Sequence, residues 1–499
     1  MHRVSSCDER ATYVLCLQLL LTVWPGRVTI NTLPEDVLLH IIHFDRMSCV
    51  GTALRDTDAM RGFWRWDRLV HVCQRWRSVV FASPNFLDLE LYCHPLTRVE
   101  LTSIWPPLPI IITNVHHLIM PEDYDFGAAI VHPNRVREIR LNITSSQLPR
   151  LASAVQEQFP ALTKFSLVLV NGHIHPTPVP VLPDGFLGAF APLLRNFTLQ
   201  FIPFPALPKL LLSATDLVSL SLVSIPHSGY FSPEAIVTSL AVMANLDFLN
   251  ISFTSPLSFP KRERRHPPPP TRTILPVLTH LRFQGVSEYL EDFMAQIDTP
   301  LLRLIWVYFF HQLIFDTPRL AQFMRRTARF QALDEACVVL DFSGVRLGYY
   351  PSIQANGLMS SLKIACKELD WGLSCVAQVI TSFFPSIHTA EHLYIYEFAY
   401  PASLWRDDIE TMRWLEIFRP FTAAKNLYMS QVVASSIAPT LEELVGGRTT
   451  EVLPGLQTIF LEGLKPSEPV QEGIGKFVAA RELFGRPITV SLWENVRKH

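Results

Sequence analysis

Residues 217–222 read LVSLSL, a phrase whose apolar residues follow the spacing apolar-x-x-apolar-x-apolar. Its second half alternates apolar and polar residues, which is the period of a β-strand with one buried face. The spacing recurs at intervals of 23 to 34 residues, between residues 136 and 301 and again from residue 390. The other copies are Val136/Ile139/Leu141, Leu162/Phe165/Leu167, Leu194/Phe197/Leu199, Leu246/Leu249/Ile251, Leu278/Leu281/Phe283, Leu301/Leu304/Trp306, Ala390/Leu393/Ile395, Ala424/Leu427/Met429 and Leu456/Ile459/Leu461. A strand that returns at such intervals predicts an array of stacked repeats.

This phrase is similar to the core of a leucine-rich repeat, in which alternate residues of a short strand point into a solenoid. Helices are predicted between the strands, at 149–157, 233–243, 287–297 and 319–328. One strand and one helix cannot bury their apolar faces alone, whereas stacked units share a continuous core. The resemblance therefore implies a degenerate, irregular leucine-rich-repeat-like α/β solenoid over residues 94–499. The alternative is a single closed α/β domain with coincidental strands.

Two other segments depart from the regular repeat pattern. The long interval before residue 390 is predicted to hold weaker repeats, with strands at 337–340 and 362–365. Residues 256–272 include the run KRERRHPPPP, whose prolines favour an extended, solvated backbone. We expect 256–272 to be a charged surface loop that interrupts the repeats. The alternatives are a nuclear-localisation patch or a ligand for a proline-reading domain.

Two apolar helical stripes precede the array. The first helix is predicted to begin at a capping box formed by Thr32 and Glu35, with Pro34 in its first turn. Its apolar face is formed by Val37, Leu38, Ile41 and Ile42. The apolar face of the second helix is formed by Leu69, Val72, Cys73, Trp76, Val79 and Val80. From periodicity alone, an ordinary helical hairpin whose stripes face each other is an open alternative.

The residue types in these stripes are more specific than their spacing. Leu33-Pro34-x-x-x-Leu38-x-x-Ile41, followed by Val72-Cys73-x-x-Trp76, resembles the F-box, and residues 79–89 resemble F-box proteins of mushroom-forming (basidiomycete) fungi. The resemblance covers 30–93 and implies a small all-α module that docks on the Skp-type adaptor of a cullin–RING ubiquitin ligase. It implies adaptor-binding roles for Leu33, Pro34, Val37, Leu38, Ile41, Leu69, Val72, Cys73 and Trp76. Residues 46–65 depart from the family pattern, because a compact F-box has less chain between its helices.

Composition bounds the class of protein. The 499 residues are 48% hydrophobic and 18% charged, which indicates a large buried core and an ordered chain. The net charge of −2 indicates no general attraction to nucleic acid or to acidic membranes. None of the eight cysteines forms a C-x-x-C pair, so neither a metal site nor a disulfide scaffold is predicted. These features favour a reduced setting, in the cytoplasm and/or the nucleus.

The N-terminal residues 1–29 are expected to be an extension outside the fold. They include an apolar run at 13–24, which is too short to span a bilayer as a helix. Asn142, Asn196 and Asn250 begin N-x-S/T sequons, although each lies in or beside a predicted strand, where a glycan fits badly. A secreted or surface leucine-rich-repeat recognition protein, with no role in ubiquitin ligation, is therefore the alternative function.

The motifs of common enzyme classes are missing from the sequence, including H-E-x-x-H, G-x-S-x-G and a complete phosphate loop. We therefore expect no catalytic residue, no cofactor and no metal. The expected function is that of a substrate-recognition adaptor in an SCF-type ubiquitin ligase. In that role, the F-box-like module binds a Skp-type adaptor and the solenoid binds a protein target that the sequence does not identify.

Overall fold

The computed structural model describes residues 33–40, 73–82, 91–93, 108–114, 122, 124–170, 179–254, 271–309, 317–327, 335–341, 344–349, 360–365, 377–378, 387–397, 411–446, 451–462 and 468–493. The chain divides into two compact units. Unit 1 comprises Met1–Leu118 with Arg135–Arg137, and unit 2 comprises Ile119–Asn134 with Glu138–His499. Within the described ranges, no helix combines the length and the apolarity needed to cross a membrane.

Unit 1 contains both predicted helical stripes. Residues 35–40 are helical and follow Pro34, whose carbonyl accepts a hydrogen bond from the backbone N–H of Leu38 at 3.1 Å. The second stripe contains α5 (Gln74–Ala82). Two short strands follow, β1 (Leu91–Cys93) and β2 (Ile110–Thr113), which pair in parallel. Apart from Leu33, Pro34 and Cys73, the described part of 30–93 is therefore helical until β1 at its end, while 1–29, Thr32 and 41–72 lie outside the described residues.

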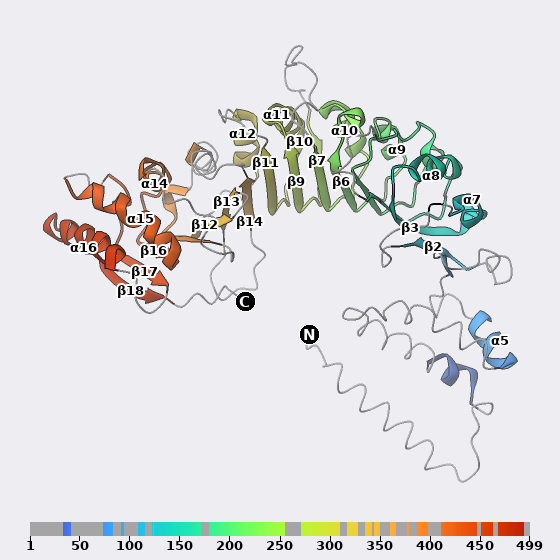
Figure 1. Ribbon diagram of the computed structural model, residues 1–499, viewed down its shortest axis with the longest axis horizontal. Coiled ribbons are helices and arrows are strands. Elements are labelled where there is room, and N and C mark those ends of the chain that lie inside the picture. The colour runs from blue at the N-terminus through green and yellow to red at the C-terminus, as the bar shows by residue number, and fades with distance from the viewer. Residues whose placement is uncertain are drawn as a thin grey trace, which may run out of the picture. The chain divides into compact units, whose positions relative to one another are not determined.

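The repeats of unit 2 form a parallel sheet of eight strands. These are β3 (Val136–Ile143), β4 (Lys164–Leu169), β5 (Asn196–Gln200), β6 (Ser219–Ile225), β7 (Phe248–Phe253), β9 (His280–Gly285), β11 (Leu304–Phe309) and β14 (Ser360–Ala365), in that spatial order. Figure 1 shows β6, β7, β9 and β11 side by side. A short separate sheet pairs β8 (Thr273–Ile274) with β10 (Ile297–Asp298). One parallel strand per repeat is the arrangement expected of a leucine-rich-repeat-like solenoid.

The register of these strands explains the repeated sequence phrase. Phe165 of β4 pairs with Phe197 of β5, and Leu220 of β6 pairs with Leu249 of β7. All four side chains are fully buried, so the apolar positions of successive repeats form continuous rows in one core. Asn142, Asn196 and Asn250 lie on β3, β5 and β7, which confirms that the three sequons are on strands.

Helices connect the strands and cover the buried rows. They are α7 (Phe126–Ala129), α8 (Leu148–Ala154), α9 (Leu207–Leu211), α10 (Pro233–Leu240), α11 (Ser287–Gln296) and α12 (Pro318–Arg326), with 3-10 turns η2 (Pro133–Arg135), η3 (Phe186–Ala189) and η4 (His227–Gly229). Helices α8, α10, α11 and α12 confirm the four predicted between strands. Helix α10 begins at Ser232, whose hydroxyl accepts a hydrogen bond from the backbone N–H of Ala235 at 3.2 Å.

The phase of β11 differs from its prediction by one residue. The sequence phrase placed Leu301, Leu304 and Trp306 in the core. In the structure Ile305 and Val307 are buried, whereas Leu301 is exposed and Leu304 and Trp306 are half-buried on the other face. Both alternating sets are apolar in this strand, so periodicity alone could not choose between them. Pairing with β9 decides the phase, because Ile305 lies opposite the buried Leu281.

The long interval in the repeat pattern also folds differently from its prediction. Strands β12 (Glu335–Asp341) and β14 occur where strands were expected, but they are not successive parallel repeats. Between them lies β13 (Gly344–Tyr349), which pairs antiparallel with both. The chain therefore makes an antiparallel three-strand segment, and β14 pairs with β11 while β12 pairs with β15.

Parallel repeats resume after this segment. The strands are β15 (His392–Glu397), β16 (Asn426–Met429), β17 (Thr458–Glu462) and β18 (Thr489–Trp493), accompanied by α14 (Thr411–Phe418), α15 (Gln431–Glu443), α16 (Glu468–Leu483), η7 (Ile387–Thr389) and η9 (Leu444–Gly446). The last strand, β18, was not predicted. Its Leu492 lies opposite the buried Leu461 yet is 61% exposed. Residues 256–270 of the predicted basic and proline-rich loop lie outside the described residues.

A buried carboxylate joins two successive repeats. Glu291 of α11 is 5% exposed and accepts hydrogen bonds from the backbone N–H groups of Arg319 and Leu320, each at 2.8 Å. These donors lie in the first turn of α12, where Thr317 makes no side-chain capping bond. The Glu291 carboxylate therefore caps α12 from the neighbouring repeat and also opposes the positive end of its dipole.

We predict that Glu291→Ala lowers the free energy of unfolding by about 1–2 kcal/mol, the usual cost of losing a helix cap. Amide hydrogen exchange of Arg319 and Leu320 measures the effect locally, because their backbone N–H groups lose their acceptor. Gln322→Ala, at an exposed position of α12, is the control. Equal exchange rates in both variants would show that Glu291 does not cap the helix.

Candidate protein-binding surfaces

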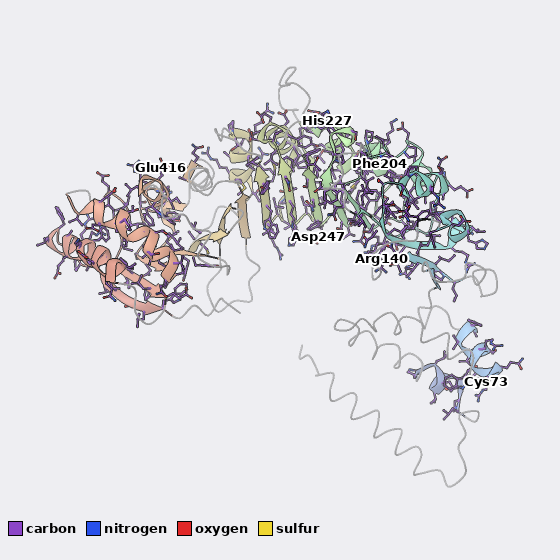
Figure 2. All side chains as sticks on the ribbon, in the orientation of Figure 1. Cys73, Arg140, Phe204, His227, Asp247 and Glu416 are labelled. Atoms are coloured by element: carbon purple, nitrogen blue, oxygen red, sulfur yellow. The ribbon has the colours of Figure 1, made fainter. Side chains whose placement is uncertain are left out.

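The two predicted N-terminal helices are joined at their starts in unit 1. The guanidinium of Arg75, at the start of α5, donates a hydrogen bond to the backbone carbonyl of Leu33, 42 residues earlier in the chain. Figure 2 labels Cys73, which immediately precedes α5. The structure thus brings the leading ends of the two predicted helices together.

The residues predicted to bind an adaptor differ in exposure. Leu38 is 0% and Trp76 is 5% exposed, so both are buried within the described unit. Leu33, Val37 and Cys73 are half-buried, and Pro34 is exposed. Among the described ones, the latter four therefore present most of the accessible atoms. Ile41, Leu69 and Val72 lie outside the described residues.

Unit 2 presents a second surface, which we call the outer sheet face. It consists of the side chains on β3 to β11 that alternate with the buried positions. Two rows run across the strands in register. The first row is Glu138, Lys164, Asn196, Ser219, Phe248, His280 and Leu304, and the second row is Arg140, Ser166, Thr198, Ser221, Asn250, Arg282 and Trp306. These side chains are half-buried or exposed, so this surface is accessible among the described residues.

Arg282 is the charge on the outer sheet face that lies against aromatic rings. Its guanidinium carbon lies 3.9 Å from the centroid of the Trp306 ring and 5.4 Å from that of Phe248. Contacts of this kind attract the cation to the ring face, on which a guanidinium can stack. Partial burial lowers the pKa of Arg282 below its ordinary value. Desolvation is thus its main electrostatic perturbation.

Other polar groups on this face have partners within it. Arg140 and Glu138 form an ion pair at 2.7 Å, and the Asn250 amide donates to the Ser221 hydroxyl at 3.2 Å. Near Arg282, the Thr279 hydroxyl donates to the Asp247 carboxylate and lies 2.6 Å from Nδ1 of His280. Figure 2 shows Asp247 at the lower edge of the strands, at the opposite edge from His227.

An aromatic row marks the corresponding face of the C-terminal repeats. Tyr428 of β16 stacks on Tyr394 of β15 with ring centroids 4.2 Å apart, and on Phe460 of β17 at 4.4 Å. Trp493 of β18 lies edge-on to Tyr428 at 5.5 Å. Tyr394 is only 2% exposed, and it packs in one cluster with Cys337. This row therefore acts largely as packing between repeats.

Sequence reasoning assigned no protein-binding role to the residues on the outer sheet face. The signal was available, because from β3 to β9 the second row consists of the single residue between the last two apolar positions of each phrase. At that position Ser166, Thr198, Ser221 and Asn250 are small or polar, and Arg282 is the one large cation between them and Trp306. The sequence pattern does not predict that Arg282 contacts two rings from neighbouring strands.

Comparisons with known proteins add little to this description. No family model matches the sequence. No curated protein matches it either. Among solved structures, the leucine-rich repeat-containing protein LegL7 of Legionella pneumophila is similar at 12% sequence identity and a TM-score of 0.27, over 71% of this chain and 94% of that one. The leucine-rich-repeat-like assignment of the repeats therefore rests on the strand register and the buried rows described above.

Proposed function

We propose that this protein is the substrate-recognition subunit of an SCF-type ubiquitin ligase in the cytoplasm and/or the nucleus. Its two N-terminal helices dock on a Skp-type adaptor, which joins the chain to a cullin–RING ligase. The outer sheet face of the repeats holds a target protein. The chain supplies no catalytic residue in this proposal, because ubiquitin transfer is performed by its partners.

One observation carries the adaptor half of the proposal. The two segments that resemble an F-box in sequence come together in one unit, joined by the hydrogen bond from Arg75 to Leu33. Leu33, Pro34 and Val37 keep accessible apolar atoms at this junction. An apolar, partly exposed helix end of this kind is suited to bind a groove or helix of another protein.

The target half is supported by architecture. Stacked repeats with one parallel strand each present an extended surface of regularly spaced side chains, which suits protein recognition. Binding a target there raises the local concentration of its lysines near the charged ubiquitin-conjugating enzyme. In this proposal the chain contributes to ubiquitin transfer only by holding the target close to the conjugating enzyme. Architecture alone does not name the target.

A pull-down with a purified Skp-type adaptor tests the docking. We expect the wild-type chain to bind, and Leu33→Ala/Pro34→Ala to weaken binding at least about tenfold, as for truncation of an interface hot spot. Trp76→Ala should weaken it too, by disturbing the packing of unit 1. Leu212→Ala, which truncates an exposed leucine of unit 2, is the control and should bind normally.

Thermal melting of each variant separates lost contacts from lost folding. The informative variant is Leu33→Ala/Pro34→Ala, because Trp76 is buried and its replacement is expected to destabilise unit 1. Undiminished binding by both variants contradicts the proposal. So does failure of the wild-type chain to bind the adaptor.

A further inference from the structure

The second row of the outer sheet face contains a cation that lies over two aromatic rings. Arg282 on β9 lies between Asn250 on β7 and Trp306 on β11 in the strand register. The rings of Trp306 and Phe248 contact its guanidinium. With a flat face on an aromatic ring, a guanidinium directs its N–H groups outward in its own plane. That edge is the part of the side chain that recognises a carboxylate by paired hydrogen bonds.

Arg282 has no acidic partner among the described residues. Its Nε atom is buried and without a hydrogen-bond acceptor there. Asp247, which precedes β7, accepts a hydrogen bond from the Thr279 hydroxyl. Removing a charged group from water without a counter-charge costs free energy, and the lowered pKa of Arg282 reflects that cost. An incoming anion would offset this cost at the same place.

The charges around Arg282 favour an acidic occupant. In the two rows of the outer sheet face, the cationic side chains are Arg140, Lys164 and Arg282, and the single carboxylate is Glu138. Glu138 is paired with Arg140. A strand face with excess positive charge attracts acidic segments and repels basic ones.

We infer that Arg282, held between Trp306 and Phe248, binds an aspartate or glutamate side chain of an acidic peptide segment in the target protein. This inference rests on the proposal that the outer sheet face holds a target. The carboxylate accepts two hydrogen bonds from the outward edge of the guanidinium. The rings keep that edge oriented, so little side-chain freedom is lost when the peptide binds.

Paired peptide libraries test the inference with the full-length chain. Two libraries share degenerate flanking positions and differ only in a fixed central residue, glutamate or glutamine. We expect the wild-type chain to retain glutamate peptides at least about tenfold more strongly than their glutamine twins, as charge-assisted paired hydrogen bonds imply. In Arg282→Gln the preference should fall to nearly equal retention.

Two further variants make the result specific. Trp306→Leu leaves the charge in place but removes the ring, and it should reduce the preference for glutamate partially. Arg325→Gln removes a guanidinium from an exposed position of α12 and should leave the preference unchanged. Thermal melting confirms that each variant is folded. If Arg282→Gln fails to fold, the inference is tested by Trp306→Leu, whose preference for glutamate peptides should be partially reduced.

Several outcomes overturn the inference. One is a wild-type chain that binds glutamate and glutamine peptides alike, or binds neither. Another is an Arg282→Gln variant that keeps the glutamate preference. A third library with central phosphoserine tests the anion, and stronger retention of phosphoserine than of glutamate overturns the assignment to a carboxylate. None of these assays contains a Skp-type adaptor, so acidic-peptide binding and adaptor docking fail independently.

Discussion

Replacing Phe165 with alanine is expected to lower the free energy of unfolding of the repeats by about 3–5 kcal/mol, the range for truncating a buried phenylalanine. Phe165 of β4 is fully buried and contacts two further buried rings. The Phe197 ring stacks on it with centroids 5.5 Å apart, and the Phe186 ring meets it edge-on at 5.4 Å. Phe186 in turn contacts Phe204 at 5.5 Å. Truncation therefore leaves a cavity shared by neighbouring repeats.

Denaturant unfolding followed by circular dichroism measures this effect. The matched control is Phe190→Ala, because Phe190 is 42% exposed and belongs to the same part of the array. Its replacement should cost about 1 kcal/mol or less. Because each repeat contacts mainly its neighbours, the loss in Phe165→Ala should spread along the array and lower the transition midpoint. Equal midpoints for the two variants would show that the contacts among Phe165, Phe186 and Phe197 do not stabilise the N-terminal repeats.

Much of the repeat architecture could be predicted from the chain because the signal is local. The phrase around Leu220 places two buried residues on one strand face, and that pattern returns with little change in eight of the other nine copies. Helix α10 could be placed as well, since Ser232 and Pro233 form a recognisable helix start. Such features need no knowledge of distant residues.

The parts that escaped prediction depend on pairing between segments. Strand β13 lies in a stretch whose apolar pattern is weak, and its place is determined by the two strands beside it. Strand β18 places Val490 and Leu492 at core positions in register, but both are largely exposed. A terminal repeat has a neighbour on one side only, so its pattern need not match the interior.

In the candidate site, too, local sequence features were predicted and contacts between distant segments were not. The sequence marked Leu33, Pro34 and Trp76 as related to a docking module, but not that Trp76 is buried while Pro34 is exposed. Nor did it mark Arg282. Its contacts come from Phe248 and Trp306, on strands separated from it by whole repeats, and the wrong phase of β11 had placed Trp306 in the core.

The phase of β11 can be tested with a pair of adjacent substitutions. Ile305→Asp is expected to lower the free energy of unfolding by more than about 4 kcal/mol, because it removes a fully buried side chain and places a carboxylate in the core. Leu304→Asp should cost about 1 kcal/mol or less, because Leu304 lies on the outer sheet face. Denaturant midpoints of the two variants measure the difference.

The same pair bears on peptide recognition. If Leu304→Asp were the damaging change, the strand would be shifted by one residue and Trp306 would point into the core. Arg282 would then lose the ring that lies 3.9 Å from its guanidinium, and the proposed carboxylate site would lose the contact that orients it. A severe loss in Ile305→Asp alone keeps Trp306 beside Arg282. Under that result, Leu304→Asp should also weaken acidic-peptide binding, because it adds a negative charge to the first row of the same face.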